Sequence, residues 1–215
     1  LEDLYESFKA NGATLNKDDK EKYRKLSMDL SMLTLQFDQN ALKDKNRFEL
    51  QITDENELSG LPESARDAAA MLAKSKDKNG WLFNLSAPSY IPFMRYSDKR
   101  DLREKMYREY MSVGNKGDEF DNKDIIKKIV NIRLEIAQLM GFKNYAEYAL
   151  EHTMAKNSAN VYKLLNQLLE AYKPIAINEY NAVEGFALGT EKENITVMPW
   201  DWSYYSNKLK DKKFN

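Results

Sequence analysis

The sequence predicts a mainly α, multi-helical fold of antiparallel helices with one small two-stranded β element. Apolar residues recur at spacings of three and four along most of the chain, which is typical of amphipathic helices. Only two short stretches alternate with a period of two, which is typical of strands. The 215 residues, 42% hydrophobic and 31% charged, suit a globular protein with one good core.

The first elements are two helices. One includes residues 1–10 and ends at Asn11-Gly12. A longer one runs from about Lys17 to Lys43, because the side chain of Asn16 can cap its first turn. An apolar stripe follows this helix at spacings of three and four: Tyr23, Leu26, Leu30, Leu33 and Phe37. The stripe predicts antiparallel packing against other helices, and a coiled-coil arm is the minor alternative.

Two strands are expected next, a half-exposed one from Arg47 to Thr53 and a short one from Trp81 to Leu85, and they can pair. An alanine-rich helix after Pro62 lies between them, since alanine has the highest helix propensity. Asn79-Gly80 then turns the chain into the second strand.

Two further helices are expected to begin at serine caps, Ser86 and Ser97. Pro88 suits the first turn of the first helix, which carries an aromatic elbow formed by Tyr90, Phe93 and Tyr96. The second helix has Leu102, Met106 and Tyr110 at intervals of four.

A polar loop over residues 114–120 is followed by a helix that Asp121 caps and Gly141 ends. One row of this helix is apolar: Ile125, Ile129, Ile132 and Ile136. Residues 142–151 form a short aromatic helix.

Ser158 is expected to cap another long helix, with a kink near Ala171 because Pro174 lies inside its pattern. Residues 189–196 are expected to be a polar loop. Asp201 would cap the final helix. No repeat, low-complexity linker or domain boundary is visible, so residues 1–215 are predicted to form a single helical segment.

Composition excludes several functional classes. The 33 basic and 34 acidic residues give a net charge of −1, which favours neither nucleic acid nor a membrane surface as a partner. No apolar run approaches the roughly 18 residues of a membrane span. Zero cysteines exclude disulfides and thiolate chemistry and fit a reducing compartment. The cluster Lys208, Lys210, Lys212 and Lys213 is expected to be a solvated helix end.

His152 is the sole histidine of the chain. A catalytic zinc site usually takes two or three histidines, or histidines with a carboxylate, and one open position. Glu147 and Glu151 are near in sequence, but Glu151 is expected to point elsewhere on its helix. We therefore assign no catalytic residue and no metal ligand within the chain.

Aromatic and hydroxyl side chains are the candidates for peptide contacts. The wall of a substrate channel would use them, although packing between layers is the alternative that we favour for such residues. The candidates are Tyr90, Tyr96, Trp200, Tyr204 and Tyr205.

Four collinear segments resemble the zinc oligopeptidases related to thimet oligopeptidase, and within them the bacterial peptidyl-dipeptidase and oligopeptidase A branch. The first is WLFNLSAPSYIPFMRYSDKRDLREKMY, beginning at Trp81. The others are ELSGLPESARDAAAMLAK from Glu57, DNKDIIKKIVNIRLEIAQLMGFKNYAEYALEHTMAK from Asp121, and MPWDWSYYSNKLK from Met198. Together they extend over nearly the whole chain.

The resemblance implies a mainly helical enzyme with a deep channel and zinc at its floor, which hydrolyses short peptides. The family's HExxH motif is absent here. The chain begins at Leu1 and both ends look cut, so we expect an inactive fragment that precedes the catalytic core and contributes part of a channel wall. Its partners would be oligopeptides and the missing C-terminal catalytic region. Its compartment would be the cytoplasm, with the periplasm as the alternative because the native N-terminus is absent. A non-catalytic helical interaction module is the competing hypothesis.

Overall fold

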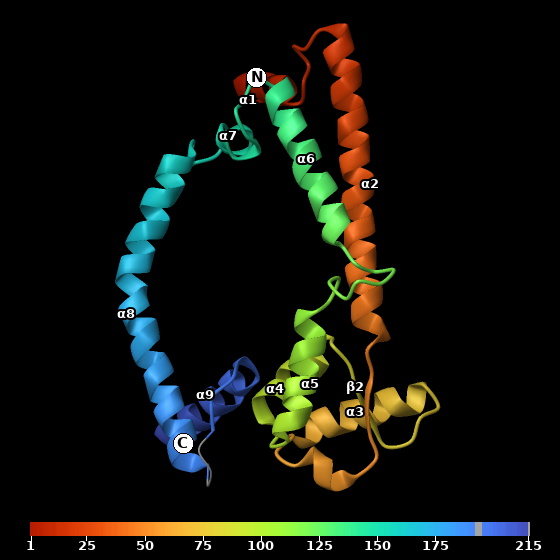
Figure 1. The fold of residues 1–215 in the computed structure, drawn as a ribbon, viewed down its shortest axis with the longest axis vertical. Coiled ribbons are helices and arrows are strands. Elements are labelled where there is room, and N and C mark those ends of the chain that lie inside the picture. The colour runs from red at the N-terminus through yellow and green to blue at the C-terminus, as the bar shows by residue number, and fades with distance from the viewer. Residues whose placement is uncertain (192–194, 215) are drawn as a thin grey trace. The chain divides into compact units, whose positions relative to one another are not determined.

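The computed structural model confirms the mainly α fold with a small β element (Figure 1). It describes residues 1–191 and 195–214. The helices are α1 Glu2–Ala10, α2 Lys17–Arg47, α3 Glu63–Ser75, α4 Ala87–Tyr96, α5 Arg100–Met111, α6 Lys123–Leu139, α7 Tyr145–Leu150, α8 Ser158–Thr190 and α9 Pro199–Phe214, with a short 3-10 helix η1 at Glu55–Leu58. The strands are β1 Leu50–Ile52 and β2 Trp81–Phe83. In this part of the chain no helix is both long and apolar enough to cross a membrane.

Residue contacts divide the chain into two compact units. Unit 1 comprises Leu1–Asn40 and Asp121–Tyr172, and unit 2 comprises Ala41–Phe120 and Lys173–Asn215. Two of the crossings between the units lie inside α2 and α8, where the helix continues without interruption. Because no linker marks these positions, composition does not reveal the division.

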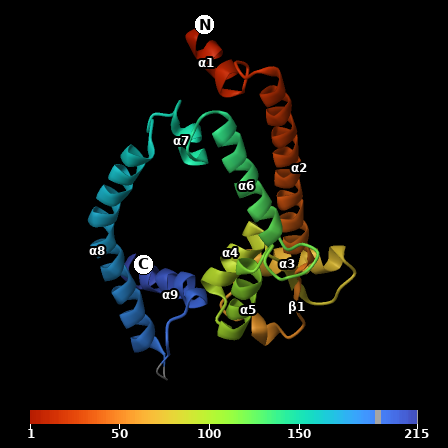
Figure 2. The same cartoon turned by 45° about the horizontal axis from the view of Figure 1, so that its top comes forward.

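Unit 1 is built on α6 and the part of α2 up to Asn40, which run antiparallel and side by side in both views (Figures 1 and 2). The predicted apolar stripe of α2 is half-buried, which agrees with packing against another helix. In α6 the predicted row is also oriented inward, since Ile125, Ile129 and Ile136 are buried.

A buried polar contact joins these two helices. Asn40 donates from Nδ2 to Oδ1 of Asn122 at 3.1 Å, and Asn122 donates to the carbonyl oxygen of Phe37 at 3.0 Å. Asn122 occupies the N-cap position of α6, so the prediction that Asp121 caps this helix was one residue early. The Asp121 carboxylate instead accepts the backbone N–H of Lys123 at 2.9 Å.

Unit 2 contains the antiparallel pair of β1 and β2, in which Gln51 lies opposite Leu82. The two strands are shorter than predicted, and α3 packs against β2. Gly80 turns the chain into β2 at φ +81°, and a Cβ there would lie 2.2 Å from the carbonyl oxygen of Ile52. Glycine is therefore required at this position.

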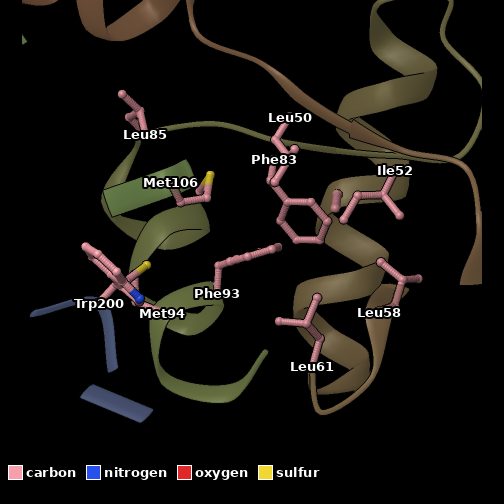
Figure 3. Packing of buried hydrophobic residues seen from close by; sticks show 11 residues of the cluster. Leu50, Ile52, Leu58, Leu61, Phe83, Leu85, Phe93, Met94, Met106 and Trp200 are labelled. Atoms are coloured by element: carbon pink, nitrogen blue, oxygen red, sulfur yellow. The ribbon is translucent and has the colours of Figure 1, made fainter. Parts of the chain in front are cut away.

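The hydrophobic core of unit 2 lies between the β pair and helices α3, α4, α5 and α9 (Figure 3). Phe83 and Phe93 meet edge to face at its centre, with ring centroids 4.8 Å apart. Other members are also almost fully buried: Ile52, Leu58, Leu61, Leu85, Met106 and Trp200. Helix α9, from the C-terminal part of the chain, thus shares one core with α3, α4 and α5.

Most of the predicted helix caps were wrong, and only Asn16 was right in both position and chemistry. Asn16 caps α2 as expected, accepting the backbone N–H of Asp19 at 2.9 Å. Ser86 holds the N-cap position of α4, but its hydroxyl donates to Asn84 at 2.6 Å and caps nothing. Ser97 ends α4, and Lys99 is the residue before α5, so Ser97 is not a cap of α5.

Helix α8 begins one residue after its cap, Asn157, whose side chain accepts the N–H of Asn160 at 2.9 Å. The prediction of a Ser158 cap was therefore wrong by one position. The helix continues through Pro174 to Thr190, so the predicted loop begins later than expected. Residues 192–194 of that loop lie outside the described part of the chain.

Candidate functional site

The five predicted channel-wall residues all lie in unit 2, on two helices that pack against each other. Tyr90 and Tyr96 are on α4, and Trp200, Tyr204 and Tyr205 are on α9. Trp200 is buried in the main core, and the two α4 tyrosines pack against the same cluster. Tyr204 and Tyr205 belong to a second cluster with residues of α8. The structure therefore brings the five residues together in two groups, and their contact with a peptide stays a prediction.

A buried carboxylate, that of Asp201, holds the N-terminus of α9 in place. It receives three charge-assisted hydrogen bonds from Arg100, the shortest at 2.7 Å, and another from Arg103 at 2.8 Å. Arg103 also donates to the carbonyl oxygens of Ser97 and Trp200. Because both guanidinium groups come from α5, this ion-pair cluster fastens α9 to α5.

Asp201 is the third residue of α9 and not its cap, which corrects the sequence prediction. Its carboxylate reaches back to accept the backbone N–H of Met198 at 3.1 Å, as the acidic residue of a capping box does. Burial by itself would raise the pKa of Asp201, but the hydrogen bonds from Arg100 and Arg103 outweigh it and lower that pKa below its usual value.

Tyr204 is held by a second polar group. Its hydroxyl donates to Asp98 at 2.7 Å, and the same carboxylate accepts from Ser59 at 2.7 Å and Lys208 at 3.2 Å. The guanidinium of Arg103 lies 4.0 Å from the centre of the Tyr204 ring. Burial opposes ionisation of Asp98, yet the three hydrogen bonds lower its pKa. Tyr204 is thus fixed by partners of its own chain.

Tyr205 and Tyr90 are also engaged. Tyr205 donates to the carboxylate of Glu191 at 2.6 Å, and burial together with this bond raises its pKa. Tyr90 stacks on Tyr110 with ring centroids 4.3 Å apart, and burial raises the pKa of Tyr90 to about 12. Both phenols are therefore neutral at physiological pH.

The open aromatic surface of unit 2 lies beside these residues. A largely apolar hollow of about 560 Å³ is lined by Tyr107, Ala176, Tyr180, Val197, Met198, Pro199 and Trp202. The rings of Tyr180 and Trp202 are nearly parallel, at 7°, with centroids 5.8 Å apart. Trp202 is 38% exposed, so it can contact a ligand directly.

Sequence reasoning singled out Trp200 of the Trp-Asp-Trp group, whereas Trp202 is the tryptophan that lines the hollow. Residues two apart on a helix point in nearly opposite directions, so one of the two tryptophans had to face outward. No local signal in the sequence identifies it, because the ion pair that fixes the inward side of α9 joins Asp201 to Arg103, 98 positions away. Tyr107 and Tyr180 carry no local signal either.

No residue set in the described part of the chain fits the zinc implied by the resemblance. Within residues 1–191 and 195–214, no group of three or more His, Cys, Asp or Glu side chains could hold a metal ion. His152 follows α7, and its Nε2 lies 3.4 Å from the carboxylate of Glu151, so the expectation that Glu151 points elsewhere was wrong. Both side chains are more than 40% exposed, and two ligands are too few for a catalytic zinc site.

Comparison with known proteins gives one family and several curated relatives. The model of the family described as "Peptidase family M3" matches residues 93–215. Oligopeptidase A of Haemophilus influenzae is 37% identical over 98% of the chain. Probable cytosolic oligopeptidase A of Arabidopsis thaliana is 35% identical over 95% of it, and dipeptidyl carboxypeptidase of Escherichia coli is 28% identical over all of it.

The relatives are much longer than this chain. The alignments cover 31% of the H. influenzae protein, 30% of the A. thaliana protein and 32% of the E. coli protein. The chain thus spans about a third of the length of the curated relatives that it matches.

Proposed function

Because this chain belongs to peptidase family M3, we propose that it is part of a zinc-dependent oligopeptidase or peptidyl-dipeptidase that hydrolyses short peptides. The observation that carries the proposal is the continuity of the similarity, which extends from end to end of the chain in relatives named for these two activities. Similarity of that extent supports a shared fold and not merely a shared motif.

The part of this chain in that enzyme is structural: it contributes a wall of the substrate channel and no catalytic group. The apolar hollow around Trp202 and Tyr180 supports this role, since an open aromatic surface can contact peptide side chains. The zinc ligands and the general base would come from sequence outside the chain, because its one histidine has too few possible co-ligands among the residues that the structure describes.

Oligopeptides are the proposed substrates, and the cytoplasm is the proposed compartment. The cytoplasm is supported by the A. thaliana relative that is named as cytosolic. A second relative from the same plant is named as organellar, so the compartment needs a direct test.

The test begins with the coding frame beyond Asn215. We expect an HExxH motif followed by a glutamate, and a longer polypeptide that contains zinc and cleaves short peptides. The 215-residue chain supplied with zinc should cleave none. Peptide hydrolysis by the chain alone would contradict its structural role, and a continuation without the motif would contradict the peptidase assignment.

A non-catalytic helical interaction module is the second candidate, and the exposed surface of α8 is the observation against which it is tested. This helix exposes many large apolar side chains, among them Leu165, Leu169 and Tyr172. Such a surface suits a partner protein, and equally the remainder of a longer enzyme. Light scattering and binding of a hydrophobic dye separate the two candidates, because an independent module should stay monomeric with little dye bound.

A further inference from the structure

Two asparagines of the sequence are followed directly by glycine: Asn11 by Gly12 and Asn79 by Gly80. Asparagine is one of the chemically labile residues. Its side-chain amide can be attacked by the backbone nitrogen of the next residue, and glycine has no side chain to hinder that approach. The attack requires that the nitrogen and the amide are both free to move. The two pairs differ in this respect.

The Asn11-Gly12 pair is held by hydrogen bonds at the end of α1. The backbone nitrogen of Gly12 donates to the carbonyl oxygen of Lys9 at 2.9 Å, and Nδ2 of Asn11 donates to the carbonyl oxygen of Ser7 at 2.7 Å. Gly12 is also buried. Both groups that would have to meet are thus bound to the preceding turn of helix, and both hydrogen bonds must break before they can react.

The Asn79-Gly80 pair lies in the turn between α3 and β2, and the side chain of Asn79 is exposed. Among the residues that the structure describes, neither this side chain nor the backbone nitrogen of Gly80 has a hydrogen-bond partner. The carbonyl oxygen of Asn79, by contrast, accepts from Nε2 of Gln51 at 2.8 Å. The two reacting groups are therefore free, although the main chain beside them is anchored.

We propose that Asn79-Gly80 is a modification site, at which the asparagine converts spontaneously to aspartate and isoaspartate. The backbone nitrogen of Gly80 forms a bond to Cγ of Asn79, and the bond from Cγ to Nδ2 breaks. Nδ2 leaves as ammonia with the proton of the Gly80 nitrogen, so a five-membered cyclic imide remains. Water then opens the imide at either carbonyl, which yields aspartate or isoaspartate. The inference goes beyond the proposed function and does not depend on it.

The isoaspartate product would disturb the β pair, because its main chain runs through Cβ and Cγ and is one carbon atom longer. Gly80 lies so close to β1 that a Cβ atom on it would be 2.2 Å from the carbonyl oxygen of Ile52. Trp81, the next residue, lies opposite Ile52 in the pair. The extra atom therefore has to displace Gly80 or Trp81, and the modified chain should be less stable than the unmodified one.

The test is incubation of the folded 215-residue chain in neutral buffer at physiological temperature, with peptide mass spectrometry at intervals. Conversion of amide to acid is measured at both asparagines of the same sample. Asn79 should convert at least about tenfold faster than Asn11, because two hydrogen bonds protect Asn11. In guanidinium chloride, which unfolds the chain, the two rates should become similar, since glycine follows both residues.

Two matched variants complete the test. Asn79→Gln should abolish conversion at position 79, because a glutamine side chain would have to form a larger ring. Asn11→Gln should leave the rate at Asn79 unchanged. Circular dichroism checks that both variants fold, as both substituted side chains are exposed.

Absence of conversion at Asn79, or equal rates at the two asparagines of the folded chain, would overturn the proposal. A preference for Asn79 that persists in the unfolded chain would also overturn it, because the fold would then not be its cause. After long incubation, the wild-type chain should have a lower denaturation midpoint than the Asn79→Gln variant treated in the same way. Equal midpoints would contradict the disturbance of the β pair.

Discussion

Helices α8 and α9 show how little residue type alone decides burial in this chain. Helix α9 is rich in lysine, yet it buries Trp200, Asp201, Tyr204 and Tyr205. Helix α8 is far more apolar, yet Val183 and Ala187 are its only buried residues among those that the structure describes. The more polar helix is therefore the better packed one.

The reason lies in the partners of each helix. Helix α9 contacts α4 and α5, and a buried ion-pair cluster fixes its first turn. Helix α8 buries side chains only where they meet Tyr204 and Tyr205. The exposed side chains Leu165, Leu168 and Leu169 recur at spacings of three and four and so share one face of α8. Such an apolar stripe normally packs against other protein, so α8 needs a covering surface that the described residues do not provide.

The substitution Asp201→Asn should destabilise the packing of α9 most. This change leaves the guanidinium of Arg103, which is 1% exposed, without its buried counter-charge. We expect the free energy of unfolding to fall by about 3–5 kcal/mol, which is typical when one partner of a buried ion pair is removed. Urea denaturation followed by circular dichroism measures the loss.

Asp211→Asn is the matched control, because Asp211 is exposed on α9 and its carboxylate accepts a hydrogen bond from Asn207 on the same helix. It should change the free energy by less than about 0.5 kcal/mol. A loss below about 1 kcal/mol in Asp201→Asn would mean that water reaches Arg103, and the ion-pair cluster would then not be what holds α9.

Low pH should also reduce the free energy of unfolding, because it protonates the Asp201 carboxylate, but the effect should be smaller than that of Asp201→Asn. The pKa of Asp201 is lower in the folded chain than in the unfolded chain, so its contribution to stability is complete above the unfolded pKa of about 3.9. The contribution is lost as the pH falls through the folded pKa. Denaturation at pH 6, 5, 4 and 3 should show stability falling with pH below about 4.

Asp98 has a lowered pKa as well and adds to this slope. The comparison with Asp201→Asn isolates the part due to Asp201, since the variant should lose stability less steeply between pH 4 and pH 3. Identical slopes in the two proteins would contradict the assignment.

Local patterns predicted the helices because spacing and caps are local properties. The stripe of α2, the row of α6 and the stop at Gly141 could all be read within one or two turns of helix. Serine caps failed where an asparagine nearby competed, as Asn157 does before α8. The side-chain amide of asparagine caps as well as serine does, so sequence alone does not choose between neighbours.

The candidate site was harder to predict because its residues are brought together by long-range contacts. Arg103 and Asp201 are 98 positions apart, and no local pattern pairs them. Without that pair, the orientation of α9 is undetermined and Trp200 cannot be distinguished from Trp202. Tyr90, Tyr96, Tyr204 and Tyr205 lie in helices that the sequence predicted, whereas Trp200, expected to precede the last helix, lies within it. The residues lining the apolar hollow emerged only from the fold.

Substitution of exposed leucines on α8 is expected to change the free energy of unfolding least. Leu165 and Leu168 are 52% and 43% exposed, so the double variant Leu165→Gln, Leu168→Gln should alter the free energy of unfolding by no more than about 0.5 kcal/mol per site. Self-association and dye binding should nevertheless decrease, because the variant removes apolar surface that is open to solvent. Light scattering over a range of protein concentrations measures the first, and fluorescence of the bound dye measures the second.

Lys163→Gln, on the same exposed stretch of α8, controls for the loss of a surface side chain and should change neither reading. A loss of stability above about 2 kcal/mol in the leucine variant would mean that these side chains are packed within the chain, as core leucines are. Helix α8 would then resemble α9, and the need for a covering surface would disappear. Weaker association at unchanged stability would instead identify α8 as the surface through which this chain meets other protein.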